Sequence, residues 1–126
     1  MQNLKFKNDI SERLLNFGVN ILELTAKLKT PVGYHVGRQL MRSGTSAGAN
    51  YEEVCGAESL ADFIHKLQVV LKELKESLYW LRLIKKATLL PGVDQNLSAV
   101  MQESNELINI IAKSVVTAKN KKFNAK

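Results

Sequence analysis

The sequence predicts an all-α protein, an antiparallel up-down-up-down four-helix bundle, and three observations support this prediction. Apolar residues recur at alternating intervals of four and three residues along most of the chain, which is the spacing of one helix face. Both prolines, Pro31 and Pro91, stand where two such periodic segments meet. No segment shows the apolar–polar alternation of a β-strand. The 126 residues are expected to form a single domain, 1–126, around one core.

The first two helices are predicted over residues 8–29 and 31–56. Thr30 is expected to cap the second helix, with Pro31 at the first helical position, where a backbone N–H has no partner in any case. Gly56 is expected to end this helix. The predicted inward faces are Ile10, Leu14, Phe17, Ile21, Leu24 and Leu28 on the first helix, and Val36, Leu40, Ser43, Ala47 and Val54 on the second.

The third and fourth helices are predicted over residues 59–87 and 94–119, and residues 120–126 are expected to fray. Ser59 and Asp62 form an imperfect capping box, and Asp94 is the expected cap of the fourth helix. Because the connections are short, neighbouring helices must run antiparallel. The predicted inward faces are Leu60, Ile64, Leu67, Leu71, Leu74, Leu78 and Leu81 on the third helix, and Leu97, Val100, Ser104, Leu107, Ile111 and either Ser114 or Val115 on the fourth.

The segment Ser43–Ala49, inside the second predicted helix, consists of seven small residues. Each glycine in a helix interior costs about 1 kcal/mol relative to alanine, so Gly44 and Gly48 need a compensating contact. Close approach of another helix supplies one; a break in the helix that presents backbone amides to an anion is the alternative. No lysine follows these glycines as in a phosphate-binding loop. We therefore favour close packing, and expect Gly44 and Ala47 to contact the third helix near residues 67–71.

The third and fourth helices carry more apolar surface than one helix face uses. One interpretation is a wide core within a single bundle. The other, which we favour, is a contact between the subunits of a homo-oligomer larger than a dimer. The candidate interface residues are Phe63, Val70 and Ile84 on the third helix and Met101, Ile108 and Val115 on the fourth.

The chain has a net charge of +6, and its basic residues are unevenly distributed. Counted from the turn between the second and third helices, Arg42 lies level with Glu73 and Arg38 lies level with Glu76, so both arginines could form surface ion pairs. Other basic residues gather at one end of the predicted bundle, where lysines also complement helix C-termini. Such a distribution is typical of a protein that contacts phosphates. The candidate nucleic-acid contacts are Arg38, Arg42, Arg82, Lys85 and Lys86.

The sequence gives little support to enzymatic, metal-binding or membrane functions. Cys55 and His65, the nearest nucleophile and base, fall on different sides of a turn and at different heights along their helices. His35 and His65 lie on different helices, and no cofactor or metal motif occurs. The chain has a single cysteine, no signal segment and no apolar run of about 18 residues. We therefore expect a cytoplasmic protein that is not an enzyme, needs no cofactor and does not bind membranes.

Two segments resemble a known family: QLMRSGTSAGANYEE from residue 39 and DFIHKLQVVLKELKESLYWLRLI from residue 62. They are similar to the four-helix-bundle proteins encoded in intervening sequences of bacterial 23S rRNA genes. The most specific motif is R-S-G-T-S-x-G-A-N at Arg42–Asn50, with W-L-R at Trp80–Arg82 as a second anchor. The resemblance covers about residues 6–119. It extends in architecture to the accessory protein of diversity-generating retroelements, which works with a reverse transcriptase and its RNA.

This resemblance implies a ring-shaped homopentamer with a basic surface that acts through binding. Two hypotheses of function follow. The first is an oligomeric nucleic-acid-binding protein, with RNA as the expected ligand, in which the basic residues contact phosphates without reading bases. The second is a structural or adaptor protein whose apolar helix faces bind another protein, such as a reverse transcriptase.

Overall fold

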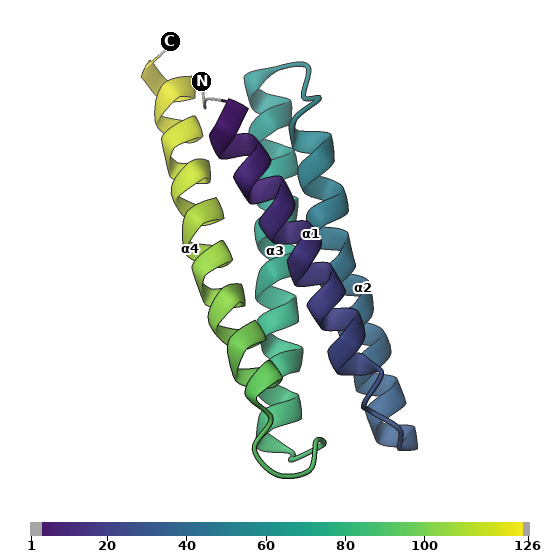
Figure 1. Cartoon of the computed structure of the whole chain (residues 1–126). Helices are drawn as coiled ribbons and strands as arrows, with labels where there is room; N and C mark the ends of the chain where they lie inside the picture. The colour runs from purple at the N-terminus through teal and green to yellow at the C-terminus, as the bar shows by residue number, and fades with distance from the viewer. Residues whose placement is uncertain (1–3, 125–126) are drawn as a thin grey trace.

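The computed structural model describes residues 4–124, with side chains from residue 9 onward. Four helices follow one another: α1 (Leu4–Thr25), α2 (Pro31–Val54), α3 (Leu60–Lys86) and α4 (Gln95–Asn124). Each packs beside the next, and α1 also contacts α4. Figure 1 shows the long helices side by side, with the start of α1 and the end of α4 at the same end of the bundle. The predicted all-α, antiparallel four-helix bundle is confirmed.

All three predicted helix caps are present. Thr30, Ser59 and Asp94 each accept a hydrogen bond from the backbone N–H three residues later, at 3.0, 3.0 and 2.9 Å. Asp62 also accepts one from the backbone N–H of Glu58, at 3.2 Å. These bonds satisfy amides that have no partner within the helix, so the starts of α2, α3 and α4 are fixed by local sequence.

Several helix boundaries differ from the prediction: α1 begins at Leu4 instead of residue 8, and α2 ends at Val54, with Cys55 and not Gly56 as its cap. Two further ends differ as well. The first helix stops at Thr25 instead of residue 29, because the chain turns there while Leu28 still reaches the core from the turn, with 2% of its surface exposed. The fourth helix continues to Asn124 instead of ending at residue 119. The prediction that residues 120–124 fray is therefore wrong. Residues 125–126 lie outside the described part of the chain. Ala118 still packs on the core, and the lysines that follow are good helix formers.

The buried face of α3 is rotated about the helix axis relative to the predicted one. Leu71 and Leu78 are only half-buried and Leu60 is exposed, whereas Val70 and Ile84 are completely buried. The cause is that α3 packs against both α2 and α4, so two neighbours cover a broad sector of its surface. The buried residues of α3 are Ile64, Leu67, Val70, Leu74, Ser77, Leu81 and Ile84.

This burial corrects the predicted subunit interface. Val70, Ile84 and Val115 are covered by their own chain, with at most 6% of their surface exposed, so they are not available to a second subunit. Phe63, Met101 and Ile108, the other three candidates, are half-buried and pack against the same core. For the buried three, the interpretation as a wide core within one bundle is the right one.

The small residues of α2 do pack closely, but Gly44 lies against α1 and not against α3 as predicted. A Cβ atom added to Gly44 would lie 2.9 Å from Cγ1 and 3.0 Å from Cγ2 of Ile21. One added to Gly48 would lie 3.5 Å from the Cβ and the carbonyl oxygen of Leu14. The helix is continuous from Pro31 to Val54, so the alternative of a broken, anion-binding segment is wrong.

The side of α2 next to these glycines packs on α3. Ser43 and Ser77 are completely buried, and the Ser77 hydroxyl donates a hydrogen bond of 2.9 Å to the Ser43 hydroxyl oxygen. Ala47, one turn after Ser43, is also completely buried. The small residues of α2 therefore serve two neighbouring helices, with glycines toward α1 and a serine toward α3.

We expect Gly44→Ala to be less stable than Gly18→Ala by about 1–3 kcal/mol. Both changes give the same gain in helix propensity, about 1 kcal/mol. They differ in the space available, because the nearest atom to a Cβ at Gly18 is the carbonyl oxygen of Gly44 at 3.9 Å. Ile21 is β-branched and rotates little. Urea unfolding of the two variants measures the difference, and equal midpoints would contradict the close approach at Gly44.

Candidate nucleic-acid interface

Arg42, the first residue of the family motif, forms ion pairs that join α2 to α3. Its Nη1 lies 3.3 Å from Oε1 of Glu73, and its Nη2 pairs with Oε2 of Glu76. The pair with Glu73 was predicted from the sequence, whereas Glu76 was assigned to Arg38 and pairs with Arg42 instead. Because two carboxylates offset one guanidinium, Arg42 contributes little net charge to a phosphate-binding surface. Within the described part of the chain, it is the one candidate contact whose charge is neutralised by an ion pair.

The Glu76 carboxylate also contacts an aromatic pair on α3. The indole N–H of Trp80 donates to Oε2 of Glu76 at 3.1 Å. Trp80 also contacts Tyr79 edge to face, with ring centroids 5.0 Å apart and planes at 76°. The hydrogen bonds from Arg42 and then Trp80 lower the pKa of Glu76. Arg42, Glu76, Trp80 and Tyr79 therefore form a continuous series of contacts from α2 to the surface of α3.

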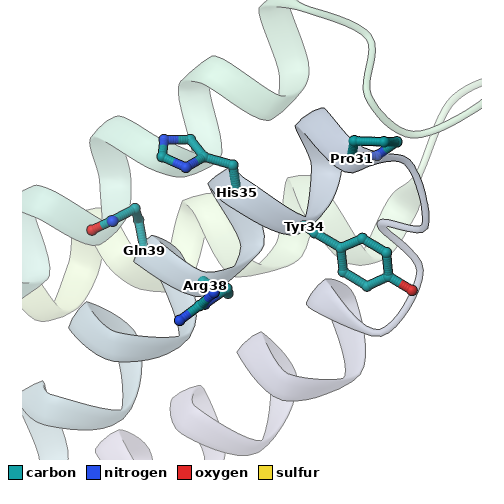
Figure 2. Close-up of a pocket in the computed structure, with 5 residues that line it drawn as sticks. All are labelled: Pro31, Tyr34, His35, Arg38 and Gln39. Carbon is teal, nitrogen blue, oxygen red and sulfur yellow. The ribbon is translucent and has the colours of Figure 1, made fainter.

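Arg38 lies on the outer face of the first turns of α2, beside an open surface depression. Figure 2 shows Tyr34 pointing to one side of the helix and His35 and Gln39 to the other, with Arg38 between them. Arg38 is exposed, and no described acid lies within ion-pair distance of it. Its charge is available to an anion, and the depression that it lines is open to solvent.

A row of basic residues lies along α3, and only its C-terminal end was predicted from the sequence. Lys72, Lys75, Tyr79, Arg82 and Lys86 follow one another at intervals of three, four, three and four residues, so they share one helix face. All five are exposed. We call this set the basic stripe. The stripe has the same alternating spacing of three and four residues as the apolar faces, so the sequence itself contains a signal for it.

The four cations of the basic stripe have no ion-pair partner among the described residues. Lys72 acts at longer range, since its charge helps to lower the pKa of Glu76. Lys85 lies next to the stripe and is exposed as well. By contrast, Lys27 at the same end of the bundle is 3.2 Å from Asp94. Among the described residues, α3 therefore carries a continuous row of unpaired positive charge along one face.

Cys55 and His65, the nucleophile and base considered from the sequence, do not form a hydrogen-bonded pair in the described part of the chain. Cys55 is exposed, and neither it nor the exposed His65 forms a side-chain hydrogen bond there. No group of three or more potential metal ligands occurs in this described part. None of the described helices combines the length and apolar character that crossing a bilayer requires.

The fold and the basic stripe define a small helical-bundle protein with an exposed cationic face. The chain belongs to the family of 23S rRNA-intervening sequence proteins, whose model matches residues 7–113. A similar solved structure is a protein of unknown function from Bacteroides thetaiotaomicron, described as a member of the S23 ribosomal protein family. It is 32% identical, with a TM-score of 0.78 over 86% of this chain and 96% of that one. No curated protein matches the sequence. The family resemblance drawn from the sequence is thus confirmed.

We expect the fluorescence of Trp80, the single tryptophan of the chain, to report the protonation of Glu76. The lowered pKa of Glu76 means that its contacts stabilise the fold above the unfolded-state value of about 4.3. That stability is lost as the pH falls through the lower folded-state pKa. The fluorescence change should therefore have its midpoint below about 4.3, and it should be absent in Glu76→Gln. Circular dichroism over the same range separates this step from unfolding, and a midpoint above that value would contradict the arrangement.

Proposed function

We propose that this protein is a non-enzymatic nucleic-acid-binding protein, with RNA as its expected ligand. The observation that carries the proposal is the basic stripe: four exposed cations on one helix face, none of them paired with a described acid. Lys85 adds charge next to the stripe, and Arg38 is a further exposed cation, on α2. Arg42 is left out because Glu73 and Glu76 neutralise it.

The physical basis is the release of counterions from a phosphate backbone. Each lysine or arginine that neutralises a phosphate releases cations condensed on the nucleic-acid backbone. Binding is therefore strong at low salt and weak at high salt. Such contacts position a strand and do not identify bases. A cationic face without a described acid partner is suited to this kind of binding, because no internal ion pair must be broken first.

RNA is favoured over DNA by the family description alone, which associates its members with 23S rRNA intervening sequences. The stripe itself would accept either backbone. A binding function also fits the exposed position of the cations, which lie on a helix surface and not in an enclosed cavity. For an RNA-binding member of this family, the cytoplasm is the expected location.

We expect neutralisation of Arg82, Lys85 and Lys86 to glutamine to weaken RNA binding without unfolding the bundle. All three are exposed, and exposed changes usually alter stability by less than about 0.5 kcal/mol each. Each lost phosphate contact should lower the slope of log K against log salt by about 0.7–0.9. Fluorescence anisotropy with two unrelated RNA sequences at several salt concentrations measures both effects.

The matched control is the glutamine variant of Lys113, Lys119 and Lys122, exposed residues of α4. It removes the same number of charges from another helix, so it tests whether position or net charge determines binding. A lower salt slope in the α3 variant alone supports the stripe. Equal effects in both variants would indicate that net charge alone attracts the RNA. Unchanged binding in the α3 variant would contradict the proposal.

We also propose that the protein is a homo-oligomer, and the pentamer is the state that the family resemblance implies. The interface cannot use Val70, Ile84 or Val115, which are buried in one chain. A different apolar row is exposed on α1, where Leu15, Val19 and Leu22 are 62%, 47% and 47% exposed at intervals of four and three residues. An exposed apolar row is suited to contact with another protein surface, and here we assign the row to a second copy.

Light scattering at micromolar concentration should return a mass several times 14.1 kDa. Leu22→Glu should reduce that mass, because it places a charge in the apolar contact. Val116→Glu is the control, since Val116 is 58% exposed on α4 and lies outside the α1 row. A parent mass of 14.1 kDa would exclude self-association and would leave the α1 row to a different protein, which is the adaptor function.

A further inference from the structure

We propose that Tyr79 is a stacking platform for an unpaired base, and that the preferred ligand of the basic stripe is therefore single-stranded. This inference rests on the proposed nucleic-acid binding and specifies the form of its ligand. It comes from one residue in the stripe that is not a cation, and from the contacts that hold this residue in place.

Tyr79 occupies the centre of the basic stripe and 55% of its surface is exposed. Lys75 precedes it by four residues and Arg82 follows by three, and Lys72 and Lys86 lie seven residues away on either side. At a rise of 1.5 Å per residue, the stripe extends about 21 Å along α3. A strand that follows the cations through its phosphates would pass directly over the tyrosine ring.

The ring is held from one side by contacts within the protein. Trp80 meets it edge to face at 5.0 Å, and the Trp80 indole is itself fixed by its hydrogen bond to Glu76. Arg42 holds Glu76 from α2. Because these contacts restrict the ring before a ligand arrives, less conformational entropy is lost when a base stacks on it.

The surroundings of Tyr79 favour a nucleobase over an apolar protein surface. Its neighbours along the stripe are Lys75 and Arg82, which would have to be desolvated beneath an apolar partner at a large cost. A nucleic acid compensates these charges with phosphates and supplies an aromatic face at the same time. Base stacking on an exposed aromatic residue within a cationic track is the usual way in which proteins bind single strands without sequence preference.

A duplex cannot make this contact without opening. Its bases are stacked on each other, and the major groove of double-stranded RNA is too deep and narrow for side chains to reach the bases. The cations of the stripe could still attract a duplex through its phosphates. Tyr79 should therefore strengthen the binding of single-stranded RNA alone, whereas the cations should strengthen the binding of both single strands and duplexes.

The experiment compares a single-stranded 12-nucleotide RNA, its duplex, and a strand of equal length with abasic positions, by fluorescence anisotropy. Tyr79→Leu should bind the single strand at least about fivefold more weakly, with an unchanged salt slope because no phosphate contact is lost. Tyr79→Phe should bind as the parent does. Tyr34→Leu is the matched control, since Tyr34 is similarly exposed, at 61%, but lies on α2.

The parent should also prefer the strand with bases over the abasic strand, and Tyr79→Leu should lose that preference. The parent's preference between the two strands does not depend on how well any variant folds. If the parent binds both strands equally, or if Tyr79→Leu binds the single strand as the parent does, the stacking inference is wrong while nucleic-acid binding stands. If the parent shows no salt-dependent binding to any of the three ligands, the proposed function itself fails.

Discussion

The contact between Ile21 of α1 and Gly44 of α2 determines how the other helices are arranged. A side chain at position 44 would occupy the space of Ile21, so the two helices can pack at this depth only with glycine there. Once α1 occupies this side of α2, the neighbouring side is left for α3, where Ser43 meets Ser77. The family motif at Arg42–Asn50 therefore specifies two helix contacts at once, and its small residues are explained by packing without any ligand.

The arginine of this motif illustrates how the bundle divides its positive charge into two classes. Arg42 is committed to the fold through Glu73 and Glu76, and Arg13 is similarly committed between α1 and α4 through Glu103 and Glu106. The cations on the outer face of α3 have no such partners. Unpaired positive charge on one helix face produces an electrostatic potential that attracts a polyanion. The paired arginines instead help to align neighbouring helices.

Much of the fold could be predicted from local sequence patterns, whereas the candidate site could be predicted only in part. The caps at Thr30, Ser59 and Asp94 were predicted correctly because a cap depends on a few adjacent residues. The pair between Arg42 and Glu73 was predicted from heights along two helices joined by a short turn. The partner of Gly44 was predicted wrongly, because the rotation of a helix about its own axis cannot be obtained from height alone.

The sequence by itself determined the helical class, the number of helices, their antiparallel order and the family, since periodicity, caps and a contiguous motif are all local properties of the chain. The tertiary structure decided which apolar rows are buried and which charges are free. Val70, Ile84 and Val115 lie in the core because two neighbouring helices cover them, whereas the equally apolar Leu15 lies outside. Burial and pairing depend on what surrounds a residue from distant parts of the chain, and spacing within one helix does not contain that information.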